Sequence, residues 1–277
     1  MSPIARLTVV PILLALSLAL LVGVPPVAAN DQVCDHLISL PGTQTVGYVI
    51  GAPGTYCLAT DVIMGASFTS GNAIEIAANY VTLDLNGHKV HGAAAGTATQ
   101  AVGIYAFNRR NVTVKNGTVW GFDTGLWLDA TIPTAGTDGA LSGYLVEGVR
   151  AELNRIVGIR VSGANSIVRN NVVANTGSST RIPNASAIGI LVYSTGGRVL
   201  DNDILTVTPA GDGQGRGIET GILSHDTLIV GNRITDVRYG AYPIGVYCGG
   251  FGKSRDNLTS GVTIPFGGFC TDAGGNN

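Results

Sequence analysis

A four-residue phrase recurs along this chain: a glycine, an aliphatic residue, a free position and a second, mostly apolar residue. Successive copies are 22, 33, 31, 32 and 24 residues apart. Self-similarity at periods of 20 to 50 residues is the signature of a solenoid, in which each repeat stacks on its neighbours. The copies begin at Gly103, Gly125, Gly158, Gly189, Gly221 and Gly245.

A second phrase, aliphatic-x-Asn-x-aliphatic, follows three of these copies and is centred on Asn170, Asn202 and Asn232. Identical polar residues at one position of successive repeats can hydrogen-bond along a stack. We therefore expect these asparagines to form a ladder inside one bend of the solenoid.

Apolar residues within a repeat alternate with a period of two, which is the period of a strand. In the copy at Gly189, Ile190 and Val192 point one way and Leu191 the other. Three short strands per repeat predict an all-β chain, a right-handed parallel β-helix of about seven coils. The ends of such a stack are exposed sheet edges that need covering. We expect N- and C-terminal caps at about residues 30–53 and 249–277.

The first 29 residues have the features of a signal peptide. Arg6 supplies a positive start, residues 7–24 are nearly all apolar, and Val27-Ala28-Ala29 offers small residues for cleavage. A membrane anchor is the alternative, but Pro11 and Gly23 interrupt the apolar run. The expectation is a single domain over residues 30–277, secreted to an extracellular or periplasmic location and not held in a membrane.

The composition excludes some classes of function. The formal net charge is −2 and no basic run is present, which disfavours nucleic-acid binding. Charged residues make up only 12% of the chain, and 40 glycines favour strands and tight turns over amphipathic helices.

The four cysteines fall at the two ends of the expected solenoid. In an exported protein an even number of cysteines indicates disulfides. We expect the pairs Cys34–Cys57 and Cys248–Cys270, with free buried thiols as the alternative. A cysteine metal site is not indicated, because no C-x-x-C motif occurs.

Residues 54–248 resemble a known superfamily. The segment PGTYCL at residues 53–58, the segment VTLDLNGH at residues 81–88 and the two recurring phrases are similar to secreted right-handed parallel β-helix repeat proteins of the pectate-lyase-like group. The resemblance implies a substrate lying along the first sheet. It does not imply one activity, because the group includes polysaccharide lyases, hydrolases, uronate epimerases and proteins without known catalysis.

The free position of the first phrase should point outward and form a row on the first sheet. Aromatic rings can stack on sugars and arginine can pair with carboxylates, so the row favours a groove for a uronate-containing or neutral polysaccharide. The alternative is that the row has no binding function and that aromatic residues occur there because they suit outward strand positions. The expected row is Glu75, Tyr105, Trp127, Arg160, Leu191, Leu223 and Tyr247.

Long insertions adjoin the first-sheet strands at residues 92–100, 129–143, 176–187 and 208–217, and loops on one side of a rigid stack often carry function. They should bring Asp129, Arg181, Asp212 and Arg216 toward the row. If the chain is a lyase, we expect Arg160, Arg216 and Glu219 to be catalytic, with an arginine neutralising the substrate carboxylate. Ca²⁺ held by Glu75, Asp123 or Asp129 would assist, and the oligomeric state stays open.

The motifs that mark individual activities in the superfamily are mostly missing. Arg181-Ile182-Pro183 is followed by Ser186 where pectate lyases have a second arginine, and Ser224-His225-Asp226 is half of an epimerase motif. These absences favour the rival interpretation, a non-catalytic surface or matrix protein that binds carbohydrate or has a structural role. The row and the one-sided loops favour the groove.

Overall fold

The computed structural model describes residues 33–130, 143–237 and 239–277. Within these ranges residues from Cys34 onward form one compact unit of 24 strands in a single hydrogen-bonded system. The expected signal peptide, residues 1–29, lies outside the described residues. In the described part of the chain, no helix is long and apolar enough to cross a membrane.

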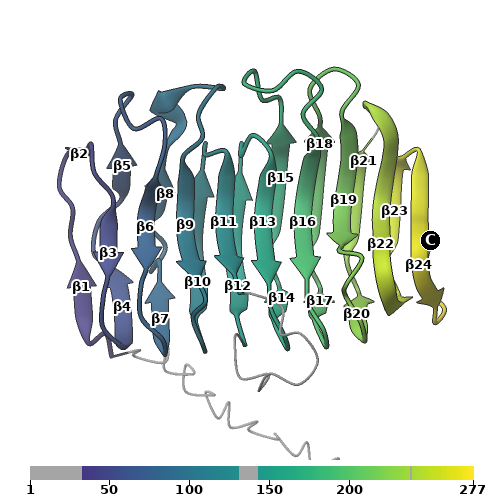
Figure 1. Ribbon diagram of the computed structural model, residues 1–277, viewed down its shortest axis with the longest axis horizontal. Helices are drawn as coiled ribbons and strands as arrows, with labels where there is room; N and C mark the ends of the chain where they lie inside the picture. Colours follow the sequence, from purple (N-terminus) through teal and green to yellow (C-terminus); the bar gives the residue numbers. More distant parts are fainter. Residues whose placement is uncertain (1–32, 131–142, 238) are drawn as a thin grey trace, which may run out of the picture. The chain divides into compact units, whose positions relative to one another are not determined.

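The strands wind into a parallel β-helix of about seven turns, which confirms the expected fold. Figure 1 shows the strands of the first sheet side by side and in chain order. Each pairs in parallel with its equivalent one coil along. The first sheet contains β3 (Tyr48–Ile50), β6 (Asn72–Ile76), β9 (Val102–Phe107), β11 (Thr124–Asp129), β13 (Val157–Ser162), β16 (Ala187–Tyr193), β19 (Gln214–Thr220), β22 (Ala241–Arg255) and β24 (Ile264–Asp272).

Two further stacks complete each coil. The second sheet contains β1 (His36–Ile38), β4 (Gly54–Leu58), β7 (Val81–Asp84), the first half of β10 (Thr113–Trp120), the first half of β12 (Leu145–Glu152), β14 (Ile167–Arg169), β17 (Arg198–Leu200), β20 (Thr227–Val230) and the end of β22. The third contains β2 (Thr43–Gln44), β5 (Val62–Met64), β8 (Lys89–His91), the second halves of β10 and β12, β15 (Val172–Gly177), β18 (Asp203–Thr208), β21 (Arg233–Val237) and β23 (Leu258–Val262). A short 3₁₀ helix, η1 (Ala93–Ala95), precedes β9.

The core consists of aliphatic ladders that run the length of the stack. On the first sheet, Ile104, Leu126, Ile159, Ile190 and Ile218 occupy equivalent positions, and each is fully buried. Burying side chains of this size contributes about 1.5–3 kcal/mol each. The alternation read from the sequence therefore distinguishes the core side of these strands from their outer side.

The glycine of the first phrase is required by close packing. A Cβ atom on Gly189 would lie 2.6 Å from the carbonyl oxygen of Gly217 and 2.8 Å from Cγ2 of Ile204. The strand enters the sheet too close to its neighbour for any side chain at this position.

The copy of this phrase that was expected at Gly221 lies at Gly217 in the structure. Gly217 lies within β19, and the residues after it, Ile218 and Glu219, are in register with β16 and β22. The copy assigned to Gly221 follows the strand in a turn, where Ile222 and Leu223 are exposed. The prediction that Leu223 belongs to the row was therefore wrong, and Glu219 takes that place.

The asparagine ladder is present, but the prediction that Asn170 belongs to it was wrong. Asn202 and Asn232 are buried in the bend between the second and third sheets, as expected. Their partner one coil earlier is Asn171, whose backbone and side-chain nitrogens both donate to Oδ1 of Asn202 at 3.0 Å. Asn170 is exposed and occupies the left-handed turn position with φ of 55°, a conformation that asparagine tolerates well.

The segments expected as caps continue the coils. β1 pairs with β4, and β23 and β24 pair with β21 and β22. Both expected disulfides are present, Cys34–Cys57 and Cys248–Cys270. Each links neighbouring coils near one end of the unit, and such cross-links are typical of oxidising compartments.

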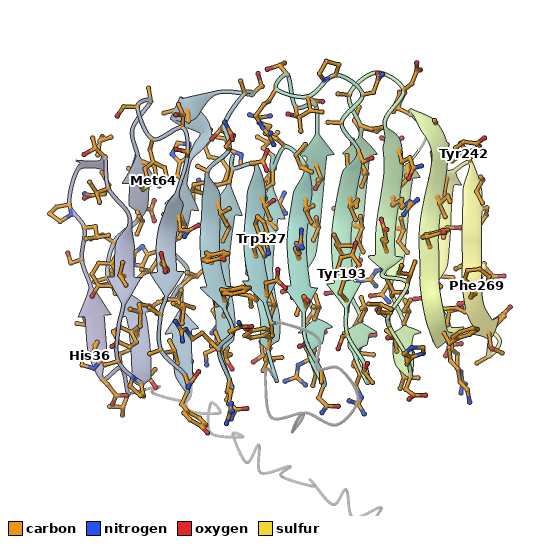
Figure 2. All side chains as sticks on the ribbon, viewed as in Figure 1. His36, Met64, Trp127, Tyr193, Tyr242 and Phe269 are labelled. Carbon is orange, nitrogen blue, oxygen red and sulfur yellow. A yellow bond between two sulfur atoms is a disulfide. The ribbon has the colours of Figure 1, made fainter. Side chains whose placement is uncertain are left out.

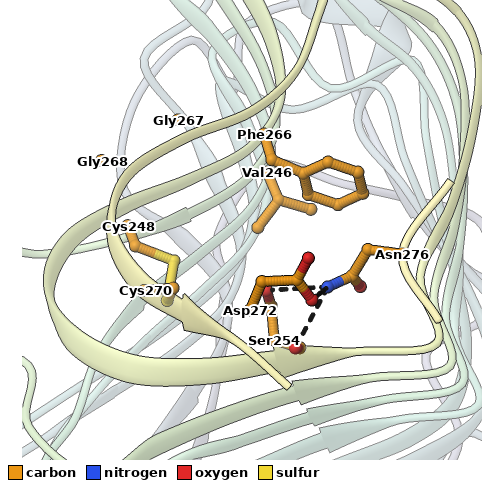
Figure 3. A pocket seen from close by; sticks show the side chains of 9 residues that line it. All are labelled: Val246, Cys248, Ser254, Phe266, Gly267, Gly268, Cys270, Asp272 and Asn276. Atoms are coloured by element: carbon orange, nitrogen blue, oxygen red, sulfur yellow. Dashed lines mark hydrogen bonds between the residues drawn. A yellow bond between two sulfur atoms is a disulfide. The ribbon is translucent and has the colours of Figure 1, made fainter. Parts of the chain in front are cut away.

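The C-terminal end of the core holds a cavity of about 170 Å³ (Figure 3). Val246 and Phe266 belong to the last coils of the apolar ladder, and Asn276 donates to Ser254 and Asp272 beside them. Oδ1 of Asn276 also accepts from both nitrogens of Asn257, at 3.1 and 2.9 Å. This cavity therefore belongs to the end of the core and of the ladder, and it is remote from the outer face of the middle coils.

Candidate functional site

Strand pairing aligns one outward residue from each coil on the first sheet. Neighbouring strands of a sheet lie about 4.8 Å apart, so adjacent members of the row are close enough for their side chains to touch. From β6 to β22 the row reads Glu75, Tyr105, Trp127, Arg160, Leu191, Glu219 and Tyr247.

The middle of the row is an aromatic and cationic cluster. The rings of Tyr105 and Trp127 meet edge to face with centroids 5.8 Å apart. The guanidinium carbon of Arg160 lies 4.4 Å from the centroid of Trp127. A cation at this distance over an indole is attracted by the ring quadrupole. The contacts fix the arginine in the row, although 30% of its side-chain surface remains exposed.

Asp129, at a neighbouring outward position, contacts both Trp127 and Arg160 of this cluster. Its Oδ2 accepts a hydrogen bond from Nε1 of Trp127 at 3.1 Å and lies 3.6 Å from Nη2 of Arg160. The carboxylate thus orients the indole while leaving the arginine only loosely paired. The sequence assigned Asp129 to a loop, whereas it is the last residue of β11.

Tyr193 completes the cluster and was missed in the sequence. Its ring centroid lies 5.8 Å from the guanidinium carbon of Arg160. It follows Leu191 by two residues on β16 and pairs with Ser162 of β13, so the strand period would have placed it on the outer face. Trp127 and Tyr193 both lie over the middle strands of the stack in Figure 2.

Burial and nearby carboxylates disfavour the ionisation of Tyr105. Partial burial raises the pKa of Tyr105, and the nearby carboxylates of Asp129 and Glu75 raise it further against the opposing effect of Arg160. Glu75 accepts a hydrogen bond from Nδ2 of Asn72 at 3.2 Å. The Tyr105 hydroxyl is therefore a neutral hydrogen-bonding group at ordinary pH, positioned among two carboxylates and an arginine.

A second charged cluster lies farther along the row. Nη1 of Arg216 pairs with Oε1 of Glu219 at 2.5 Å, and the guanidinium carbon lies 4.1 Å from the centroid of Tyr247. Both charged side chains are mostly buried, with 14% and 13% of their surface exposed. Leu191, itself 5% exposed, separates this cluster from Arg160. The three residues predicted to be catalytic thus lie on one face but form two groups.

Three of the expected loops border the side from which the strands enter the first sheet, above the strands in Figure 1. The loops before β9 and β16 touch, because Oγ1 of Thr97 and Oγ1 of Thr180 are 2.9 Å apart. Arg181 in the second of these loops donates to Oδ1 of Asp123 at 2.9 Å. Burial raises the pKa of Asp123, while Arg181 opposes that shift. Asp212 is exposed in the loop before β19, and most of the loop after β11 falls outside the described residues.

The expected calcium ligands do not come together. Glu75, Asp123 and Asp129 have separate partners, namely Asn72, Arg181 and the pair of Trp127 and Arg160. In the part of the chain that the structure describes, no three His, Cys, Asp or Glu residues are grouped to hold a metal ion.

The second tryptophan of the chain lies on a different face. Trp120 ends β10 on the third sheet and stacks on the imidazole of His91 with ring centroids 4.1 Å apart. The chain has only two tryptophans, and both are on the outside of the coils. Trp120 is therefore a matched reference for experiments on Trp127.

No family model matches this chain, and no curated relative matches it. A search of solved structures finds similarity to the enzymatically active domain of tailspike protein 2 of bacteriophage CBA120. The TM-score is 0.50 and the sequence identity 16%, over 82% of this chain and 35% of that chain. This chain spans about a third of the length of the tailspike chain, and the likeness supports the fold alone.

Proposed function

We propose that this chain is an exported protein that binds a uronate-containing polysaccharide along the outer face of its first sheet. The cluster of Trp127 and Arg160 carries the proposal. An indole offers an apolar surface to the C–H face of a sugar ring, and an arginine fork suits a carboxylate. The loose pairing of Arg160 with Asp129 leaves guanidinium N–H groups available to a ligand.

The shape of the row suits a polymer. A chain lying along the stack axis would cross one strand about every 4.8 Å and meet Tyr105, Trp127 and Arg160 in turn. Tyr193 and Glu75 would supply hydrogen bonds at its edge. Export is supported by the features of residues 1–29 and by the two disulfides, which are most common outside the cytoplasm.

A lyase is the second candidate, and the pair of Arg216 and Glu219 favours it. In β-elimination, a base removes the proton next to the uronate carboxylate, the bond to the leaving sugar oxygen breaks, and water protonates that oxygen. A substrate carboxylate that displaced Glu219 from Arg216 would be neutralised by the arginine and would free Glu219 as the base. The same ion pair keeps Glu219 occupied without substrate, so binding is the better supported function.

Calorimetric titration with polygalacturonate, with galactan as the neutral control, tests the proposal. Trp127→Ala should weaken binding about tenfold or more, because stacking and the ordered position of Arg160 are both lost. Trp120→Ala should bind like the wild type. Equal affinity of Trp127→Ala and wild type would move the site away from this face.

The same samples separate binding from catalysis. A rise in the ultraviolet absorbance of unsaturated uronate, followed with Ca²⁺ and with chelator, would establish elimination. Glu219→Gln should then lose the rise while keeping most of the affinity. A flat trace with intact binding leaves the non-catalytic binding protein as the function for that polymer.

A further inference from the structure

A groove of about 360 Å³ lies on the outside of the C-terminal coils, at the turn that leads from the first sheet into the second. Two columns of outward residues line it, Asp226 with Phe251 on one side and Leu228, Lys253 and Thr271 on the other. Strand pairing aligns the members of each column across β20, β22 and β24. The row on the first sheet does not contribute to this lining, and the volume is in the range typical of small-ligand sites.

Exposed aromatic rings form a ladder along one side of the groove. The imidazole of His225 stacks on the ring of Phe251 with centroids 6.0 Å apart, and the ring of Phe269 follows Phe251 at 6.1 Å. Phe251 is 65% exposed and Phe269 is 63% exposed, so the fold gains little stability from burying them. Neighbouring apolar side chains that remain this exposed indicate a surface that contacts a ligand or a partner.

The polar groups of the groove carry no net charge. Asp226 and Lys253 are both exposed, and within the described ranges neither of them forms an ion pair. A carboxylate only accepts hydrogen bonds, an ammonium group only donates them, and the hydroxyl of Thr271 does both. Because the two opposite charges balance, the groove favours an uncharged ligand that both donates and accepts hydrogen bonds.

These groups fit a sugar better than a protein surface. A protein that covered the rings would also remove Asp226 and Lys253 from water, and buried charges without partners are costly. The hydroxyl groups of a sugar can donate to the carboxylate and accept from the ammonium group. Its C–H face is apolar and can lie against an aromatic ring.

We propose that this groove binds an uncharged sugar unit of a glycan. The ring of Phe251 receives the apolar face of the sugar, and Asp226 and Lys253 bind its hydroxyl groups. Phe269 lies one strand farther along the stack, where a second sugar unit of the same glycan would contact it. The site does not depend on the function proposed for the first sheet, which requires an acidic ligand.

Titration calorimetry with cellotetraose, maltotetraose and N-acetylated chitotetraose tests the inference. The wild type should bind at least one of the three saturably. Phe251→Ala should weaken that binding tenfold or more, and Asp226→Asn should weaken it several-fold. Tyr242→Ala is the matched control and should bind like the wild type, because Tyr242 is a 70% exposed aromatic residue of the same strand, β22. Figure 2 shows Tyr242 near the opposite end of the strands from Phe269.

Further measurements separate loss of the site from loss of the fold and from the first-sheet proposal. Phe251→Ala should leave the melting temperature nearly unchanged, because the ring is mostly exposed, and it should bind polygalacturonate like the wild type. Trp127→Ala should retain the neutral sugar.

Three results would overturn the inference. They are no saturable binding of any of the three sugars, unchanged binding in Phe251→Ala, and self-association of the wild type that Phe251→Ala abolishes in sedimentation velocity without any sugar binding. The last result would identify the groove as an interface between copies of this chain. If polygalacturonate binding still requires Trp127 in any of these cases, the proposal for the first sheet survives the loss of this one.

Discussion

Buried amides connect the coils residue by residue. Asn202 accepts two hydrogen bonds from Asn171 and donates to Oδ1 of Asn232 and to the carbonyl of Val168. The same pattern continues from Asn232 to Asn257. Each amide satisfies backbone groups of the bend that would otherwise be buried without partners.

Asn202→Leu should lower the free energy of unfolding by about 3 kcal/mol or more, because several buried donors and acceptors lose their partner at once. Asn170→Gly is the control, and a change within about 0.5 kcal/mol is expected because glycine suits its positive φ. Urea denaturation followed by circular dichroism measures both. Similar stabilities of the two variants would contradict the ladder.

The repeat pattern predicted that asparagines form a ladder, but it did not determine which asparagine of each coil belongs to it. The adjacent pair Asn170 and Asn171 left the ladder member ambiguous, and only hydrogen bonding shows that the second asparagine points inward.

Strand β19 shows how register decides what one element contributes. Moving the phrase from Gly221 to Gly217 brings Glu219 into the row beside Tyr247 and removes Leu223. The sequence contained a signal for this register, since Gly217 is 28 residues from both Gly189 and Gly245. Gly217-Ile218-Glu219-Thr220 and Gly221-Ile222-Leu223-Ser224 match the phrase equally well, and the second of them lies in a turn.

A pair of substitutions tests this register. Ile218→Ala should cost about 2–5 kcal/mol, because the side chain is fully buried and its removal leaves a cavity. Ile222→Ala should cost no more than about 0.5 kcal/mol, because Ile222 is 74% exposed. Denaturant melts of the two variants compare them directly, and the reverse order would restore the register read from the sequence.

For the molecule as a whole, the repeat alone was sufficient to predict the architecture. Recurring phrases specify a stack, and the core alternation specifies strands. The disulfides followed from the position of the cysteines near each end. The outer face was predicted less completely, because its loops, turns and ion pairs do not repeat from coil to coil.

The stack is a rigid platform on which side chains far apart in the sequence form one surface. Tyr105, Trp127, Arg160 and Tyr193 come from four successive strands of the first sheet. We propose that a uronate polymer binds along this surface. The two tryptophans lie on different faces of the coils and report on it separately.

Tryptophan emission of single-tryptophan variants is the most direct test. Trp120→Phe leaves Trp127 as the only tryptophan, and Trp127→Phe leaves Trp120. Titration with oligogalacturonate should change the emission of Trp127 saturably, in step with the calorimetric binding curve, and leave that of Trp120 unchanged. Binding with no change at Trp127, or a change at Trp120 alone, would contradict the account.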